Sequence, residues 1–447
     1  MTAMNGKKQN TSTGAAEKLE QYIENRDFSV DAENDLPAGW SRWEPLWTEA
    51  SCQVQTHPEG LEMEAPQKPY GVGGVWQKIA GIAGGQAYGV EATCALRDII
   101  YPHQSVMVRI HWTQQGQLLH PAGVLVRGIN SDDTAQFADV LVAPQEADGA
   151  QVHLELKWPR GGSVLWKQVS MRATEPPPPR PVKIGTVYLR PQHSTPQRNL
   201  ELCAAQIDAA GALGLDIVCL SEALAIVGSG ATVRDVAEPI PGAATELLGA
   251  AARRNGIWVV AGLTECDGEV LYNTAVLLDR QGELAGRYRK VHLPREEWKQ
   301  GITPGEDYPI FQTDFGTIAI QICYDWFFPE PHIIWGMQGV EVVFAPTWGN
   351  TKPDVDGRVE GETTFRVRAR DNGVYMVPSV YDGQSMVIDP MGRILVANGG
   401  KEGVFWCEVD LNEREHLPWV GHWHATGSRD RMPHTYAPLL EEASTTR

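Results

Sequence analysis

The chain has 447 residues, of which 42% are hydrophobic and 21% charged, so it can bury a sizeable core and is long enough for two domains. Its formal net charge of −18 argues against a nucleic-acid partner and against an anionic membrane surface, because both require a basic protein face. No apolar stretch approaches the roughly 18 residues of a membrane span, and the first residues lack the apolar core of a secretory signal.

The first half of the chain predicts a tail followed by an all-β domain. Residues 1–35 are polar and predict a solvated tail with one short helix over residues 15–26. From residue 36 to residue 175, short β-rich segments recur between turn residues without helical patterns, which is typical of an antiparallel β-sandwich. The clearest segments are Ala87–Cys94, Ser105–Trp112, Gly123–Arg127, Gln151–Trp158 and Ser163–Arg172. The domain resembles jelly-roll, carbohydrate-binding-module-like domains. The resemblance rests on Trp76, Tyr88 and the alternating apolar residues Val108, Ile110 and Trp112.

A proline-rich stretch at residues 176–181 predicts an interdomain linker, because prolines offer no donors to a sheet and hold the chain extended. Over residues 182–447 strands alternate with helices, which predicts an α/β domain. The predicted strands are Val182–Leu189, Asp216–Leu220, Ile257–Leu263, Thr274–Leu278, Gly316–Ile322, Val340–Ala345 and Tyr375–Val380. The predicted helices are Pro196–Leu213, Ala243–Asn255 and Pro331–Gln338.

Two charged side chains of this second domain are candidates for catalysis. Glu222 directly follows an apolar strand, and a carboxylate at the rim of a sheet is partly desolvated, which makes it a usable general base. Lys290, in the segment Tyr-Arg-Lys-Val-His-Leu, could be a buried ammonium that stabilises an oxyanion. Taken alone, Glu222 is more often a helix-capping residue and Lys290 part of a basic strand edge.

Cys323 is the sharpest candidate, because an apolar strand ends on it and turns toward a predicted helix in Ile-Cys-Tyr-Asp-Trp-Phe-Phe-Pro-Glu330. Backbone amides and the positive end of the helix are expected to favour its thiolate. The alternative is that Cys323 is a small buried hydrophobic residue. Asp325 is expected to hold this turn rather than to donate a proton.

The cysteines and histidines give no sign of a metal or a disulfide. The seven cysteines are scattered, odd in number and without a Cys-x-x-Cys pair, so neither a disulfide framework nor a zinc site is expected, and a reduced, cytoplasmic setting is favoured. His422 and His424 would share one face of a strand, but the sequence supplies no third ligand. We therefore predict no metal and no organic cofactor.

Taken together and in this order, the segments around Glu222, Lys290 and Cys323 resemble the three signatures of the nitrilase, or carbon–nitrogen hydrolase, superfamily. The resemblance implies a four-layer α-β-β-α sandwich with a Glu–Lys–Cys triad at one end of its two sheets. It also implies a homodimer or higher homo-oligomer, and a second glutamate near the triad, assigned to Glu297 with Glu296 as the alternative. Supporting matches are Tyr272–Asn273–Thr274, Ala345–Pro346–Thr347–Trp348 and Arg368–Ala369–Arg370–Asp371–Asn372.

The predicted reaction is hydrolysis of a small amide or N-carbamoyl amine through a cysteine thioester. Lys290 and the backbone N–H of Tyr324 would stabilise the oxyanion. Trp326, Trp348 and Asn273 are the candidates for contacts with substrate. Two alternatives stay open: an amide or acyl transferase that uses the same triad, and a non-catalytic carbohydrate-binding protein whose second domain is an inactive scaffold.

Overall fold

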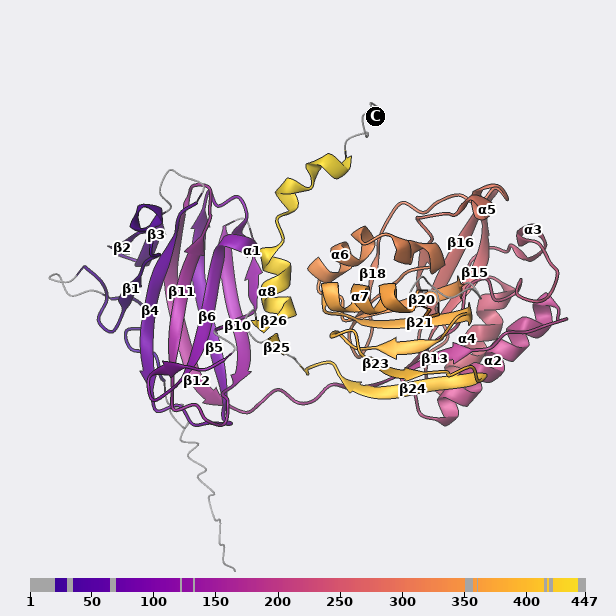
Figure 1. The fold of residues 1–447 in the computed structure, drawn as a ribbon, viewed down its shortest axis with the longest axis horizontal. Coiled ribbons are helices and arrows are strands. Elements are labelled where there is room, and N and C mark those ends of the chain that lie inside the picture. Colours follow the sequence, from indigo (N-terminus) through magenta and orange to yellow (C-terminus); the bar gives the residue numbers. More distant parts are fainter. Residues whose placement is uncertain are drawn as a thin grey trace, which may run out of the picture. The chain divides into compact units, whose positions relative to one another are not determined.

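The computed structural model describes residues 21–29, 35–64, 70–120, 123–131, 133–349, 357–359, 361–413, 416–417 and 421–440 (Figure 1). The chain divides into two compact units. Unit 1 comprises residues 1–177 with 418–421, and unit 2 comprises residues 178–417 with 422–447. No helix in the described ranges is long and apolar enough to cross a membrane.

Unit 1 consists of two antiparallel sheets. The first has the order β1 (Ser41–Trp43), β4 (Val72–Ala80), β11 (Gly149–Lys157), β6 (Val106–Gln114) and β7 (Gln117–Leu118), and β8 (Val124–Leu125) also pairs with β6. The second has the order β2 (Gln53–His57), β3 (Gly60–Glu64), β12 (Ser163–Thr174), β5 (Ala87–Arg97), β10 (Thr134–Val142) and β9 (Gly128–Asn130). The short helix α1 (Pro102–Ser105) precedes β6, and the 3-10 helix η1 (Thr48–Ala50) precedes β2.

The two sheets of unit 1 share one apolar core. Alternate residues of each strand face inward, as on β6, where Val108, Ile110 and Trp112 are buried in the same cluster as Phe137 of β10 and Trp166 of β12. Because the strand period is two, the residues between them lie on the outer face of the sheet. That outer face carries the polar side chains considered below.

The expectation of a solvated tail is not met over residues 21–29. Ile23 and Phe28 are buried in the core of unit 1, and the backbone N–H of Tyr22 donates to the carbonyl of Met171 at 3.0 Å. Of the predicted helix, residues 15–20 lie outside the described residues, whereas residues 21–26 are not helical. Burial of apolar side chains against the sandwich outweighs local helix propensity here.

Unit 2 contains two six-stranded sheets. The first has the order β17 (Leu284–Arg289), β16 (Val270–Leu278), β15 (Trp258–Asp267), β14 (Ile217–Cys219), β13 (Pro181–Tyr188) and β24 (Gly403–Asp410). The second has the order β18 (Ile310–Gln312), β19 (Thr317–Ile320), β20 (Val342–Gly349), β21 (Tyr375–Asp382), β22 (Met386–Ile388) and β23 (Ile394–Ala397). Strands β13, β14 and β15 are parallel, as are β19, β20 and β21.

Helices cover the outer faces of these sheets (Figure 1). One apolar cluster joins α2 (Pro196–Ala212) and α4 (Ala243–Asn255) to the first sheet, a second lies between the sheets, and a third joins the second sheet to α6 (Glu330–Met337) and α7 (Glu362–Asn372). The order is therefore helices, sheet, sheet, helices. The remaining elements are α3 (Val233–Val236), α5 (Arg295–Trp298), η2 (Cys323–Phe327), β25 (His416–Leu417), β26 (Gly421–His422), α8 (Trp423–Asp430), η3 (Pro433–Thr435) and η4 (Ala437–Leu440).

The predicted helices and strands of unit 2 differ from the observed ones mainly at their ends. One exception concerns His422 and His424. Strand β26 ends at His422 and helix α8 begins at Trp423, so the two histidines do not alternate along one strand.

Candidate active site

Three strand ends of unit 2 carry the predicted triad. Glu222 follows β14, Lys290 follows β17, and Cys323 follows β19 as the first residue of η2. The end of β14 fits closely against β15, because a Cβ on Gly262 would lie 2.6 Å from the Cα of Glu222. Only glycine allows this approach, so Gly262 sets the position of the glutamate.

The structure brings Lys290 into contact with two carboxylates. The Nζ atom of Lys290 donates to Glu222 Oε1 at 2.9 Å and to Glu297 Oε1 at 2.5 Å. Asn273 Nδ2 donates to Glu222 Oε1 at 2.7 Å and to Glu297 Oε2 at 3.4 Å. Lys290 is 0% exposed and Glu222 2% exposed, whereas the side chain of Glu297 is 18% exposed, so the network is buried except at Glu297. Glu296 is exposed, and Glu297 is the glutamate that lies against Lys290.

Charge pairing keeps Lys290 protonated in this buried position. Burial by itself would lower the pKa of Lys290, but Glu222, Cys323 and Glu297 outweigh that effect and raise the pKa above its usual value. Burial raises the pKa of Glu297 to about 7, against the opposing pull of the Lys290 ammonium.

Cys323 departs from expectation in its protonation state. The residue is partly accessible, yet burial of the thiol raises the pKa of Cys323 to about 12, and the negative charge of Glu222 adds to the rise. Lys290 and the backbone at Gly349 and Trp348 lower it, but not enough to offset burial. The prediction that the site favours the Cys323 thiolate is therefore wrong in the absence of substrate, because desolvation outweighs the effect of the neighbouring amides. A neutral thiol needs a base at the moment of attack.

The nucleophile turn is held by the carboxylate of Asp325, which is fully buried. It accepts hydrogen bonds from the backbone N–H of Ile322 at 3.0 Å, the backbone N–H of His292 at 3.0 Å and the hydroxyl of Tyr288 at 2.8 Å. The His292 ring lies 2.8 Å away. These contacts join the Cys323 turn to the segment that carries Lys290. Cys323 itself has a φ of +42°, a conformation that non-glycine residues adopt mainly where surrounding contacts hold it. The sequence offered no sign that Tyr288 takes part.

Of the three predicted substrate contacts, Trp326 lies in the core, whereas Asn273 and Trp348 lie at the site. Trp326 is buried in the cluster under α6 and α7, with its ring 3.9 Å from that of Phe327, so it packs the core instead of lining the site. Asn273 binds the two glutamates, as described above. Trp348 lies at the site through its backbone N–H, which donates to Glu222 Oε2 at 2.8 Å. Tyr324, whose backbone N–H is the predicted oxyanion donor, directly follows Cys323 as the second residue of η2.

The fold and the site define an α/β enzyme with a buried carboxylate–ammonium pair beside a cysteine. The carbon–nitrogen hydrolase family model matches residues 183–418, and this chain belongs to that family and is a carbon–nitrogen hydrolase. A nitrilase from Pyrococcus abyssi is 32% identical over 246 residues, which cover 52% of this chain and 90% of that protein. The omega-amidase NIT2-A of Xenopus laevis is 30% identical over 243 residues, or 49% of this chain and 87% of that protein. The beta-ureidopropionase of Arabidopsis thaliana is 36% identical over 152 residues, or 32% of this chain and 37% of that protein.

Proposed function

We propose that the chain hydrolyses the C–N bond of a small amide or N-carbamoyl amine, with Cys323 as nucleophile and Glu222 as general base and acid. The observation that carries this proposal is the buried network in which Lys290 holds Glu222 at 2.9 Å beside the Cys323 turn. Such a network supplies a base for the thiol and a fixed positive charge for the oxyanion.

In the first half of the reaction, Glu222 takes the proton of the Cys323 thiol while the sulfur forms a bond to the carbonyl carbon. The electron pair of the C=O bond moves to the oxygen. The Lys290 ammonium has three N–H groups, of which two bind Glu222 and Glu297, so the third can donate to this oxyanion together with the Tyr324 N–H. A compact ammonium suits this position better than a guanidinium fork.

In the second half, the C–N bond breaks as Glu222 returns its proton to the leaving nitrogen, which departs as ammonia or an amine. Glu222 then deprotonates a water molecule, the water attacks the thioester, and the thiol of Cys323 is restored. Glu297 holds Lys290 and the water in place. The cycle consumes one water and needs no redox partner.

The site favours amides and carbamoyl compounds over nitriles. Attack on a nitrile places charge on a nitrogen that must be protonated early, whereas attack on an amide creates an oxyanion that an ammonium stabilises directly. Asp325 is the nearby acid two residues beyond Cys323, but its carboxylate already accepts from Ile322, His292 and Tyr288. The relatives named above comprise a nitrilase, an omega-amidase and a beta-ureidopropionase, so the choice among these classes depends on the site.

A substrate panel tests the proposal. Short amides, N-carbamoyl amines and nitriles are incubated with the protein and with its Cys323→Ala variant, and ammonia release is measured. We expect release from an amide or a carbamoyl amine, little from nitriles and none from the variant. Faster turnover of nitriles than of every amide and carbamoyl compound would contradict the substrate class. An added amine that captures the acyl group in place of water would identify a transferase.

We also propose a fold for each unit, a cellular compartment and an oligomeric state. Two antiparallel sheets around one core support a jelly-roll-like assignment for unit 1, and the three apolar clusters of unit 2 support the four-layer α-β-β-α sandwich. All seven cysteines are free thiols, which suits a reducing, cytoplasmic compartment. A homodimer or higher homo-oligomer is proposed from the family resemblance.

A further inference from the structure

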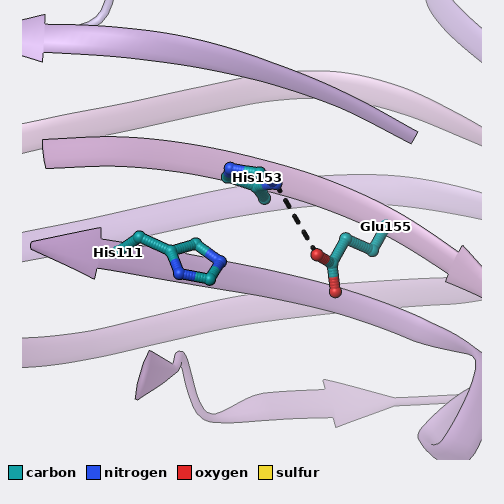
Figure 2. A group of neighbouring side chains, drawn as sticks. All are labelled: His111, His153 and Glu155. Carbon is teal, nitrogen blue, oxygen red and sulfur yellow. Dashed lines mark ion pairs between the residues drawn. The ribbon is translucent and has the colours of Figure 1, made fainter. Parts of the chain in front are cut away.

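Three potential metal ligands meet on the outer face of the first sheet of unit 1, whereas the residues of the candidate active site belong to unit 2. His111 lies on β6, and His153 and Glu155 lie on the neighbouring strand β11 (Figure 2). His111 pairs with Gln151 and His153 pairs with Arg109 in the antiparallel register, so the two histidines are diagonal neighbours on one face. One donor atom from each of the three side chains lies within 4.8 Å of the others.

The group is largely enclosed although it lies opposite the apolar core. His153 is 6% exposed and Glu155 8% exposed, while His111 is partly exposed. The backbone at Gly123 approaches from one side, since a Cβ there would lie 2.7 Å from His111 Cε1. Polar groups at such depth normally have hydrogen-bond partners.

Two of the ring nitrogens lack such a partner. The Nδ1 atoms of His111 and His153 are both buried without a hydrogen bond to any described residue. The Nε2 atom of His153 lies 3.1 Å from Gln151 Oε1, an acceptor that places the proton on Nε2 and leaves Nδ1 with a free lone pair. That lone pair faces Glu155 Oε1 at 3.7 Å.

A purely structural ion pair accounts for only part of this arrangement. Arg109 Nε donates to Glu155 Oε2 at 3.2 Å, which satisfies one carboxylate oxygen. It leaves the two imidazole nitrogens without a partner and Glu155 Oε1 directed toward them. In a metal site, Arg109 would hold the second oxygen of a ligating carboxylate, and Gln151 would hold the second nitrogen of a ligating histidine.

We infer that His111, His153 and Glu155 bind a divalent transition-metal ion of the zinc class, with a coordination position left for water or an exogenous ligand. Two imidazoles and one carboxylate are a donor set of open zinc sites, whereas calcium and magnesium prefer oxygen ligands throughout. Ligands at 2.0–2.2 Å around a tetrahedral ion lie about 3.4 Å apart, so modest side-chain rotations complete the site. The inference is independent of the proposed hydrolase function.

Cobalt(II) tests this inference, because its visible absorption distinguishes nitrogen and oxygen ligands from thiolates. The tag-free full chain is freed of metal with a chelator, titrated with cobalt(II) and then with zinc(II), and compared with His111→Ala, Glu155→Gln and His57→Ala. His57 lies on the other sheet of unit 1, on β2, and serves as the matched control. Circular dichroism checks that each variant is folded.

We expect one equivalent of cobalt(II) without a thiolate charge-transfer band, and its displacement by zinc(II). Affinity should fall at least about tenfold in His111→Ala and in Glu155→Gln and stay unchanged in His57→Ala. His111 is partly exposed, so its variant should fold even where Glu155→Gln does not. Failure of the native chain to bind cobalt(II), equal affinity in folded His111→Ala, or a thiolate band from the bound metal would each overturn the inference.

Discussion

Replacing Lys290 by methionine removes the one positive charge that two carboxylates share. Lys290 is 0% exposed and contacts Glu222 at 2.9 Å and Glu297 at 2.5 Å, and methionine keeps much of the apolar volume. The variant therefore leaves two buried acidic groups, joined only through Asn273, without a counter-charge. It also removes an oxyanion donor.

The two losses have different magnitudes. Loss of one oxyanion donor lowers kcat by about 10²–10³, or roughly 2.7–4 kcal/mol of transition-state stabilisation. Leaving a buried charge unpaired costs about 3–5 kcal/mol of folding free energy, which protonation of a carboxyl partly relieves. Without Lys290 the pKa of Glu297 should rise further above its value in the unfolded chain. A raised carboxyl pKa means that the folded state binds more protons, so the variant should lose stability as the pH rises through neutrality.

The assay combines urea unfolding at about pH 6 and pH 8 with ammonia release on the best substrate of the panel. We expect Lys290→Met to be folded at the lower pH, to be less stable at the higher pH and to lose at least about 10²-fold in kcat. Lys299→Met, at an exposed lysine of the same segment, is the matched control and should keep the native values. A folded Lys290→Met with kcat within tenfold of the native enzyme would show that Lys290 does not stabilise the oxyanion.

Other changes test separate parts of the site. In the native enzyme, kcat/KM should fall as the pH drops below about 7, because Glu297 takes up a proton. The pH profile of Glu297→Gln should lack this decrease. A decrease that persists unchanged in the variant would assign it to another group. Asp325→Asn should cost about 2–3 kcal/mol in urea unfolding, since the carboxylate that accepts from Ile322 N–H is lost; a native midpoint would show that the turn holds without it. Gly262→Ala should lower kcat at least about tenfold, because the new Cβ would lie 2.6 Å from the Cα of Glu222 and displace that residue. Native kinetics in this variant would mean that the two strands adjust freely.

Features that depend on local pattern could be predicted from the sequence. Glu222 and Cys323 follow apolar strands and Lys290 follows the basic strand β17, and strands that end at the same edge of a sheet bring such residues together. The positions of Glu222 and Lys290 at a shared edge followed from this rule together with the family resemblance. The contact of Glu297 with Lys290 depends on the course of the loop that contains α5, which spacing alone left open between residues 296 and 297.

Features that depend on three-dimensional packing could not be predicted from the sequence. The raised pKa of Cys323 results from burial by groups distant in sequence, which the strand–turn pattern does not show. Ile23 and Phe28 looked like part of a polar segment, yet they fill the core of unit 1. His111 and His153 are 42 residues apart, and only the register of β6 with β11 makes them neighbours. The pairing of these two strands is a long-range contact that the local pattern of the sequence does not show.

In the proposed mechanism, Cys323 carries the acyl group during turnover. Intact-protein mass spectrometry after rapid acid quench, followed by peptide mapping, measures this directly during hydrolysis of the best amide. We predict a mass increase equal to the acyl group, located on Cys323 and lost when the substrate is exhausted. An acyl group on another residue, or full turnover by Cys323→Ala, would contradict the account.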